Sequence, residues 1–101
     1  MSKFKHGVLT GEQVQEVFID AKRNKYALPA VNVTSTSTVN AVMETASELN
    51  SPAIIQFSHG GCQFYAGKGL KNEDNQAAIS GGISGAVHVH QMAELYGASI
   101  I

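Results

Sequence analysis

Apolar residues along the chain recur in two spacings, one typical of helices and one typical of buried strands. One helical face consists of four residues at three- and four-residue steps: Val14, Val17, Phe18 and Ala21. Thr10 can cap the start of this helix, and Gln13 stands where its side chain completes a capping box. The pattern therefore predicts a helix that starts after Thr10 and ends near residues 23–25.

Two short apolar runs predict strands on either side of a second helix. Residues 27–33 form the first run, and Pro29 stands near its start, where a missing N–H does least harm. Residues 53–58 form the second, whose continuous apolar start is typical of a strand covered on both faces. Between them, the hydroxyl-rich residues 34–38 offer several caps for a helix over 38–49. The inner face of this helix is predicted from five apolar residues: Val39, Val42, Met43, Ala46 and Leu49.

The last third of the chain combines glycines with a long helical pattern. Residues 59–70 are typical of a glycine-rich loop, and the polar residues 71–75 are expected to face solvent. A third helix is predicted over 76–96, with Gly97 as its stop and a third strand over 98–101. One stripe of this helix is predicted to face inward: Ile79, Ile83, Val87 and His90. The helix also contains three glycines that either weaken it or permit close packing: Gly81, Gly82 and Gly85.

Helices and strands thus alternate, beginning with a helix and ending with a strand. Such alternation predicts parallel strands joined by right-handed crossovers, which is an α/β fold. Three parallel strands make a poor domain alone, because such a sheet needs both of its faces covered. No linker or low-complexity tract divides the chain, so we expect residues 1–101 to be a single segment of a larger protein.

Composition narrows the class of protein. Of the 101 residues, 44% are apolar and 15% are charged, and the net charge of −1 gives no basic field for a nucleic acid. One cysteine excludes an internal disulfide, and no apolar run is long enough to cross a membrane. The basic start of the chain has no apolar stretch behind it, unlike a signal peptide. We therefore expect a soluble cytoplasmic protein with no nucleic-acid or membrane partner.

Two polar residues stand where predicted strands end. In parallel α/β folds, functional groups gather at the carboxyl ends of the strands, and Asn32 and Ser58 occupy that position. An amide and a hydroxyl suit a sugar hydroxyl or a phosphate oxygen. The alternative is that each side chain only caps the turn that follows it.

The other candidate motifs are weaker. The segment from Gly61 to Lys68 fails as a P-loop, because five residues precede the second glycine and Gly69 stands where a hydroxyl is needed. His88 and His90 do not share a helix face, so they are not expected to bind one metal ion. His59 lies at a strand end but is isolated. His6 is expected to lie on the surface, and Cys62 is expected to be a small packing residue.

Four motifs occur together in a fixed order. They are Leu-Pro-Ala-Val-Asn at 28–32, Gln-Phe-Ser-His-Gly-Gly at 56–61, Phe-Tyr-Ala-Gly-Lys-Gly at 64–69 and Val-His-Gln-Met-Ala-Glu-Leu-Tyr-Gly at 89–97. Together they closely resemble the N-terminal part of class II fructose-1,6-bisphosphate aldolases, over essentially the whole chain. The resemblance implies a (β/α)₈ barrel, of which this chain holds the leading helix and the first two to three strands. It also implies a zinc-dependent lyase that splits fructose 1,6-bisphosphate into dihydroxyacetone phosphate and glyceraldehyde 3-phosphate, commonly as a homodimer.

The resemblance assigns substrate contacts to three residues of this chain. The position of Ser58 binds the glyceraldehyde 3-phosphate moiety, that of Asn32 hydrogen-bonds substrate near the reacting carbons, and that of Gln56 lies close by. The catalytic aspartate and the zinc ligands are expected beyond Ile101, so the chain alone is expected to be inactive. None of the four histidines matches a ligand position, and His59 replaces the usual asparagine of the family.

Two other functions stay open from the residues alone. One is a non-catalytic α/β module that binds phosphate or assembles with a complementary remainder. The other is a nucleotide-binding protein, which the failed P-loop spacing disfavours.

Overall fold

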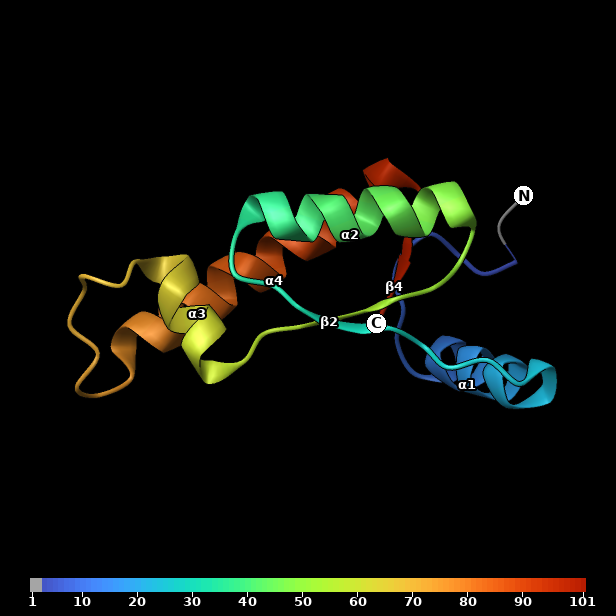
Figure 1. The fold of residues 1–101 in the computed structure, drawn as a ribbon, viewed down its shortest axis with the longest axis horizontal. Helices are drawn as coiled ribbons and strands as arrows, with labels where there is room; N and C mark the ends of the chain where they lie inside the picture. Colours follow the sequence, from blue (N-terminus) through green and yellow to red (C-terminus); the bar gives the residue numbers. More distant parts are fainter. Residues whose placement is uncertain (1–2) are drawn as a thin grey trace.

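The computed structural model describes residues 3–101 and contains four helices and four short strands in these residues (Figure 1). In chain order the elements are β1 (Gly7–Val8), α1 (Glu12–Asn24), β2 (Ala30–Asn32), α2 (Thr36–Leu49), β3 (Ile54–Gln56), α3 (His59–Ala66), α4 (Gln76–Tyr96) and β4 (Ser99–Ile100). The predicted alternation of helices and strands is confirmed. Strand β1 was not predicted, because two residues are too few to show a period.

All the strand pairs are parallel, as predicted. Strand β2 pairs with β3, and β1 pairs with β4. Backbone bonds from Ile101 N–H to the Ala53 carbonyl and from Ile55 N–H to the Ile101 carbonyl, both 2.9 Å long, join these two pairs. The neighbours therefore run in the order β1, β4, β3, β2.

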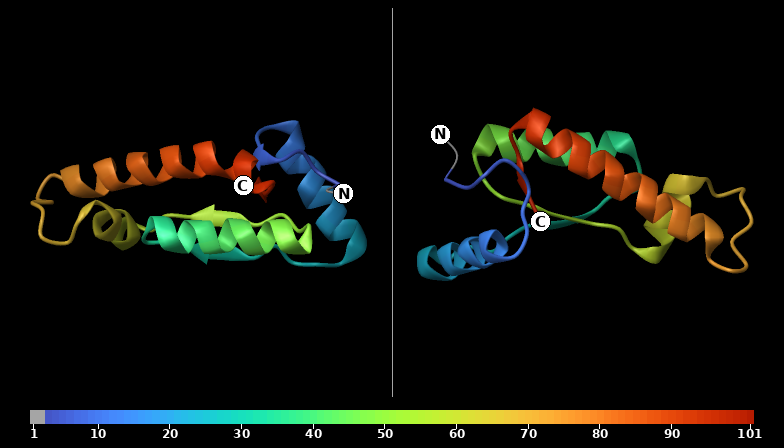
Figure 2. Two further views of the ribbon diagram at one scale, coloured as in Figure 1. Left: turned by 90° about the horizontal axis from the view of Figure 1, so that it is seen from above. Right: turned by 180° about the vertical axis from the view of Figure 1, so that it is seen from behind.

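The core lies between the strands and helices α2 and α4, which lie side by side (Figures 1 and 2). Its most buried members are aliphatic: Val33, Val39, Met43, Ala93 and Ile100. Helix α1 lies at one end of the molecule and α3 at the other (Figure 2). Strand residues alternate between faces, and Ala30, Asn32 and Gln56 are exposed on the face away from the core. We call this exposed surface, formed by Ala30, Asn32 and Gln56, the open face.

The helix starts depart from the predictions in detail. Helix α1 begins after Gly11, not after a Thr10 cap, although the Gln13 side chain does accept from the Thr10 N–H at 3.4 Å. Helix α2 begins at Thr36, two residues before its predicted start. There Ser35 caps the helix and Thr38 reaches back to it, which forms a capping box.

The predicted glycine-rich loop over 59–70 is wrong for its first eight residues, which form α3. Ser58 caps this helix, since its Oγ accepts from the Gly61 N–H at 3.0 Å. A side chain at position 61 would place its Cβ 3.0 Å from the Val33 carbonyl oxygen. Glycine here serves close packing of α3 on the end of β2, not loop flexibility.

Helix α4 has its predicted length, but the predicted inner stripe is wrong. Ile79, Val87, His90 and Ile83, which is 61% exposed, face solvent. The buried face is made mostly of small residues: Ala77, Ala78, Gly81, Gly85, Val89 and Ala93. The glycines therefore permit close packing, because Gly81 lies against the backbone of α3 and Gly85 against the Phe57 ring.

Two other predicted core positions are also exposed. Leu49, at the end of α2, is 70% exposed, and Phe18 of α1 is 42% exposed. Both predicted strands are shorter than their apolar runs, because only three residues of each make ladder pairs.

Candidate functional site

Asn32 and Gln56 are brought together by strand pairing. They are register partners at the carboxyl ends of β2 and β3, so they stand side by side on the open face. Both are exposed, and neither side chain makes a hydrogen bond within residues 3–101. Two neighbouring amides therefore present free donors and acceptors to a ligand.

Ser58 lies two residues beyond Gln56, where β3 passes into α3. Its Oγ accepts one bond from the Gly61 N–H, which leaves the hydroxyl proton available as a donor. The close approach of Gly61 to the Val33 carbonyl fixes the start of α3 beside the end of β2. The geometry of Ser58 permits both of its expected roles, as a helix cap and as a ligand-binding residue. Its side chain caps α3 and is also exposed at the edge of the sheet.

The start of α3 adds backbone donors to this group. The first N–H groups of a helix have no partner inside the helix and attract anions. Together with the two amides and the hydroxyl, they form a surface suited to phosphate and sugar hydroxyls. Asn32, Gln56 and Ser58 include no acid or base, so these three residues can bind and orient a ligand but cannot transfer protons.

The His59 side chain makes a hydrogen bond to Asn75, which the sequence did not predict. Its Nε2 donates to Oδ1 of Asn75 at 3.1 Å, which ties the start of α3 to the start of α4. Asn75 itself adopts a left-handed conformation, with φ of 62°. His59 therefore has a structural contact next to the candidate site, and its side chain is exposed.

The remaining candidates do not join this site. His88 is half-buried and bonds Asn40 of α2 at 2.8 Å, whereas His90 is exposed, so the two side chains lie in different environments. Cys62 is half-buried where α3 meets α4. Lys68 lies in the exposed segment after α3. Residues 3–101 contain no cluster of three or more His, Cys, Asp or Glu side chains that could hold a metal ion.

A charged cluster on α1 lies at the opposite end of the molecule from α3 (Figure 1). The Lys3 ammonium, the Tyr26 hydroxyl (2.7 Å) and the Asn24 amide (2.9 Å) all donate to the Asp20 carboxylate. These bonds, that from Lys3 foremost, hold the pKa of Asp20 below its ordinary value. Burial first, and then the bond to Asp20, raise the pKa of Tyr26 to about 12.

The Asp20 cluster predicts an acid-sensitive contribution to stability. Because folding lowers the pKa of Asp20, its contribution is present above the unfolded pKa of about 4 and is lost as pH falls through the folded pKa. We expect the Asp20→Asn variant to lose less free energy of unfolding than the parent between pH 6 and pH 3, measured by urea denaturation. The control is Asp74→Asn, an exposed carboxylate without a side-chain hydrogen bond in the described part of the chain. Equal acid sensitivity of parent and Asp20→Asn would contradict the assignment.

No helix within residues 3–101 is both long enough and apolar enough to span a lipid bilayer.

Comparison with known proteins gives a consistent result. Residues 12–101 match the family described as class-II fructose-bisphosphate aldolase. The chain is 59% identical over 97 residues to a fructose-bisphosphate aldolase of Edwardsiella ictaluri, and 58% identical over 98 residues to the class 2 enzyme of Escherichia coli K12. Each match covers 96% of this chain and 27% of the relative, so the chain spans about a quarter of the length of these relatives.

A solved structure agrees with these matches. A crystal structure of a Campylobacter jejuni fructose-bisphosphate aldolase superposes with a TM-score of 0.86 at 47% identity, over 96% of this chain and 27% of that chain. The α/β architecture found here is thus consistent with the N-terminal portion of an aldolase barrel. The chain belongs to the class II fructose-bisphosphate aldolase family.

Proposed function

We propose that residues 1–101, as a single segment, provide substrate-binding groups for a class II aldolase that reversibly cleaves fructose 1,6-bisphosphate. The observation that carries this proposal is the register pairing of Asn32 with Gln56 on the open face, with Ser58 next to them. Family membership supports the same reaction class, because the matched relatives are named fructose-bisphosphate aldolases.

Each of the three residues has a role that its geometry permits. Asn32 and Gln56 donate to and accept from the hydroxyl and carbonyl oxygens near the bond that breaks. Ser58 and the free N–H groups at the start of α3 bind the phosphate of the glyceraldehyde 3-phosphate half. These groups hold the substrate in one orientation, which is a substantial part of catalysis.

The chemical step needs groups that residues 3–101 do not supply. The resemblance implies a zinc ion, but the described residues contain no cluster that fits it. We place the zinc ligands and the catalytic aspartate in a part of the protein that this chain does not contain. As part of the same proposal, the whole protein is a cytoplasmic homodimer.

A fusion protein tests the proposal directly. Residues 1–101 are joined to the part of the Edwardsiella relative that follows its matched segment, and cleavage is followed by the release of triose phosphates. We expect zinc-dependent cleavage by this fusion and none by the purified 101-residue chain. Cleavage by the chain alone would contradict the placement of the catalytic groups. A folded fusion that binds zinc without cleaving the substrate would contradict the proposed function.

A further inference from the structure

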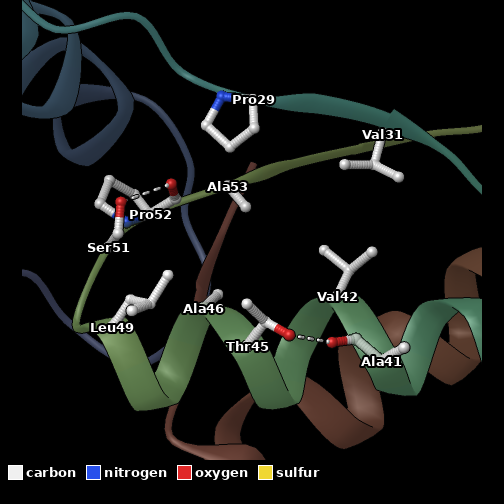
Figure 3. A pocket seen from close by; sticks show the side chains of 10 residues that line it. All are labelled: Pro29, Val31, Ala41, Val42, Thr45, Ala46, Leu49, Ser51, Pro52 and Ala53. Atoms are coloured by element: carbon white, nitrogen blue, oxygen red, sulfur yellow. Dashed lines mark hydrogen bonds between the residues drawn. The ribbon is translucent and has the colours of Figure 1, made fainter.

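Two of the hollows in the described residues are similar in volume but differ in chemistry. The hollow between α2 and β2, of about 360 Å³, is lined mostly by apolar side chains, among them Val31 and Leu49 (Figure 3). The two serine and threonine hydroxyls in its lining already donate to backbone carbonyls. The hollow between α3 and α4, of about 350 Å³, instead contains the polar side chains of His59 and Asn75. Because His59 directly follows Ser58, this second hollow adjoins the candidate site.

The first turn of α3 is weak on its own. It contains Gly60 and Gly61, and glycine is a poor helix former. It also has no acidic residue to interact with the helix dipole. Ser58 binds two amides of this turn, since its Oγ accepts from the Gly61 N–H at 3.0 Å and its carbonyl accepts from the Cys62 N–H at 2.8 Å. The N–H groups of His59 and Gly60 have no partner inside the helix. The position of the whole turn therefore depends on contacts outside α3.

Asn75, at the start of α4, provides such a contact. This residue occupies the N-cap position of α4, but its side chain does not cap the helix. Instead, Oδ1 of Asn72 accepts from the Ala78 N–H at 2.9 Å. The Asn75 side chain is therefore available to His59, whose Nε2 donates to Oδ1 of Asn75 at 3.1 Å. The Asn75 backbone has φ of 62°, a left-handed conformation that asparagine tolerates better than most residues.

The bond between His59 and Asn75 completes the attachment of α3 to the rest of the molecule. Further along the helix, the backbone of α3 packs against Gly81 of α4. On the strand side, Gly61 lies against the end of β2. The bond from His59 adds a connection at the very start of the helix. Without it, the glycine-rich first turn is free to separate from α4, and the Ser58 hydroxyl then loses its fixed position.

We propose that His59 is a positioning residue that holds Ser58 and the first N–H groups of α3 in place for the phosphate of glyceraldehyde 3-phosphate. It acts through its hydrogen bond to Asn75 and not by contact with the substrate. This inference rests on the proposed function, in which Ser58 binds that phosphate. The phosphate is remote from the bond that breaks, so loss of positioning should weaken the binding of one substrate without slowing the chemical step.

The condensation reaction tests this inference, because it measures the two triose phosphates separately. In the fusion protein described above, His59→Ala should raise the KM for glyceraldehyde 3-phosphate by about three- to tenfold, the effect of one hydrogen bond. The KM for dihydroxyacetone phosphate and kcat should change by less than about twofold. The matched control is His6→Ala, which removes an exposed histidine beside Gly97 at the far end of α4. It should leave all three constants unchanged.

Two further variants separate positioning from general structural damage. Asn75→Gly removes the acceptor but permits the left-handed backbone, so it should raise the same KM as His59→Ala does. The double variant should be no worse than either single variant, because both remove one bond. His59→Gln keeps a nitrogen donor at the ε position of the side chain and should restore the KM of the parent.

Hydrogen exchange measures the positioning itself. In the same fusion, His59→Ala should speed exchange of the Gly61 N–H by about three- to tenfold, because the first turn of α3 opens more often. The Gly67 N–H, which donates to the Gln63 carbonyl at 3.0 Å at the other end of α3, should exchange at the rate of the parent. Unchanged exchange at Gly61 would overturn the positioning role.

The kinetic outcomes decide between the alternatives. An unchanged KM for glyceraldehyde 3-phosphate in His59→Ala, or equal rises in the KM values of both substrates, would overturn the role of His59. Failure of His59→Gln to restore the KM would overturn it too, because the donor would then not be the group that matters. Ser58→Ala tests the proposed function in the same assay. If it leaves the KM for glyceraldehyde 3-phosphate unchanged, the proposed phosphate site fails; if it raises that KM and His59→Ala does not, only the role of His59 fails.

Discussion

Replacing Asn32 by alanine in the fusion protein is expected to lower kcat/KM for fructose 1,6-bisphosphate by about 100-fold or more. Loss of one hydrogen bond to a reacting group typically costs about 10²–10³ in rate. The Asn32 side chain is exposed and makes no hydrogen bond within residues 3–101, so its removal should not destabilise the fold. Steady-state kinetics and the melting temperature of the same preparations separate the two effects.

Control variants make this prediction specific. Gln15→Ala removes an exposed amide from α1 and should leave kcat/KM within twofold of the parent. Gln56→Ala should lower kcat/KM, because Gln56 is the register partner of Asn32. If Asn32→Ala stays within threefold of the parent, the residue is a turn-forming residue and not a substrate ligand.

The Gly81→Ala substitution is expected to destabilise the chain by about 1–3 kcal/mol, although alanine is the better helix former. A Cβ at this position would lie 1.9 Å from the Cys62 carbonyl oxygen and 3.0 Å from the Ala66 nitrogen. Both contacts are with the backbone of α3, so no side-chain rotation relieves them. Helix α3 must then move away from α4, which opens the close contact between the two helices. Urea denaturation of the purified chain measures the loss.

Gly82→Ala is the matched control. The new Cβ would lie 3.2 Å from the Cys62 sulfur, the end of a side chain that can shift. Because the gain in helix propensity offsets this contact, we expect a change within about 1 kcal/mol of the parent. Equal free energies of unfolding of the Gly81→Ala and Gly82→Ala variants would show that α3 does not pack closely on α4 at Gly81. In the fusion, Gly81→Ala should also lower activity, since α3 carries the Ser58 cap.

The helices with strong periodicity were largely predictable from the sequence. Helices α1, α2 and α4 have apolar residues at helical spacing and residues that stop them, and their positions are confirmed to within about two residues. Helix α3 was missed because Gly60 and Gly61 are poor helix formers. The preference for glycine at position 61 comes from the Val33 carbonyl, a tertiary contact that no local pattern contains.

Which face of α4 is buried could not be predicted from hydrophobicity. The rule that large apolar residues lie inside favours Ile79, Ile83 and Val87, yet these are exposed. The buried face of α4 is instead the one with the smallest side chains, because the helix packs directly on the backbone of α3 and on the Phe57 ring. Backbone-to-backbone distance therefore determines the orientation of this helix, and a hydrophobic pattern does not report that distance.

The candidate site was predictable in part. Asn32 and Ser58 follow from the position of strand ends alone, whereas Gln56 came only from the family resemblance. That Asn32 and Gln56 are neighbours depends on the register of β2 with β3, which is set by tertiary packing. The roles of all three residues in binding substrate stay predictions.

The pairing of β1 with β4 joins residues that lie more than 90 positions apart in the sequence. The Gly7 N–H donates to the Ala98 carbonyl at 2.7 Å and the Leu9 N–H to the Ile100 carbonyl at 2.8 Å, across almost the whole sequence. Closing so long a loop costs more entropy than any other strand pair here. It also imposes an order during synthesis, because residues 7–9 leave the ribosome long before their partners exist. Within the described residues, β1 is therefore made before its partner β4, and until β4 exists the segment that leads into α1 is not held to the sheet.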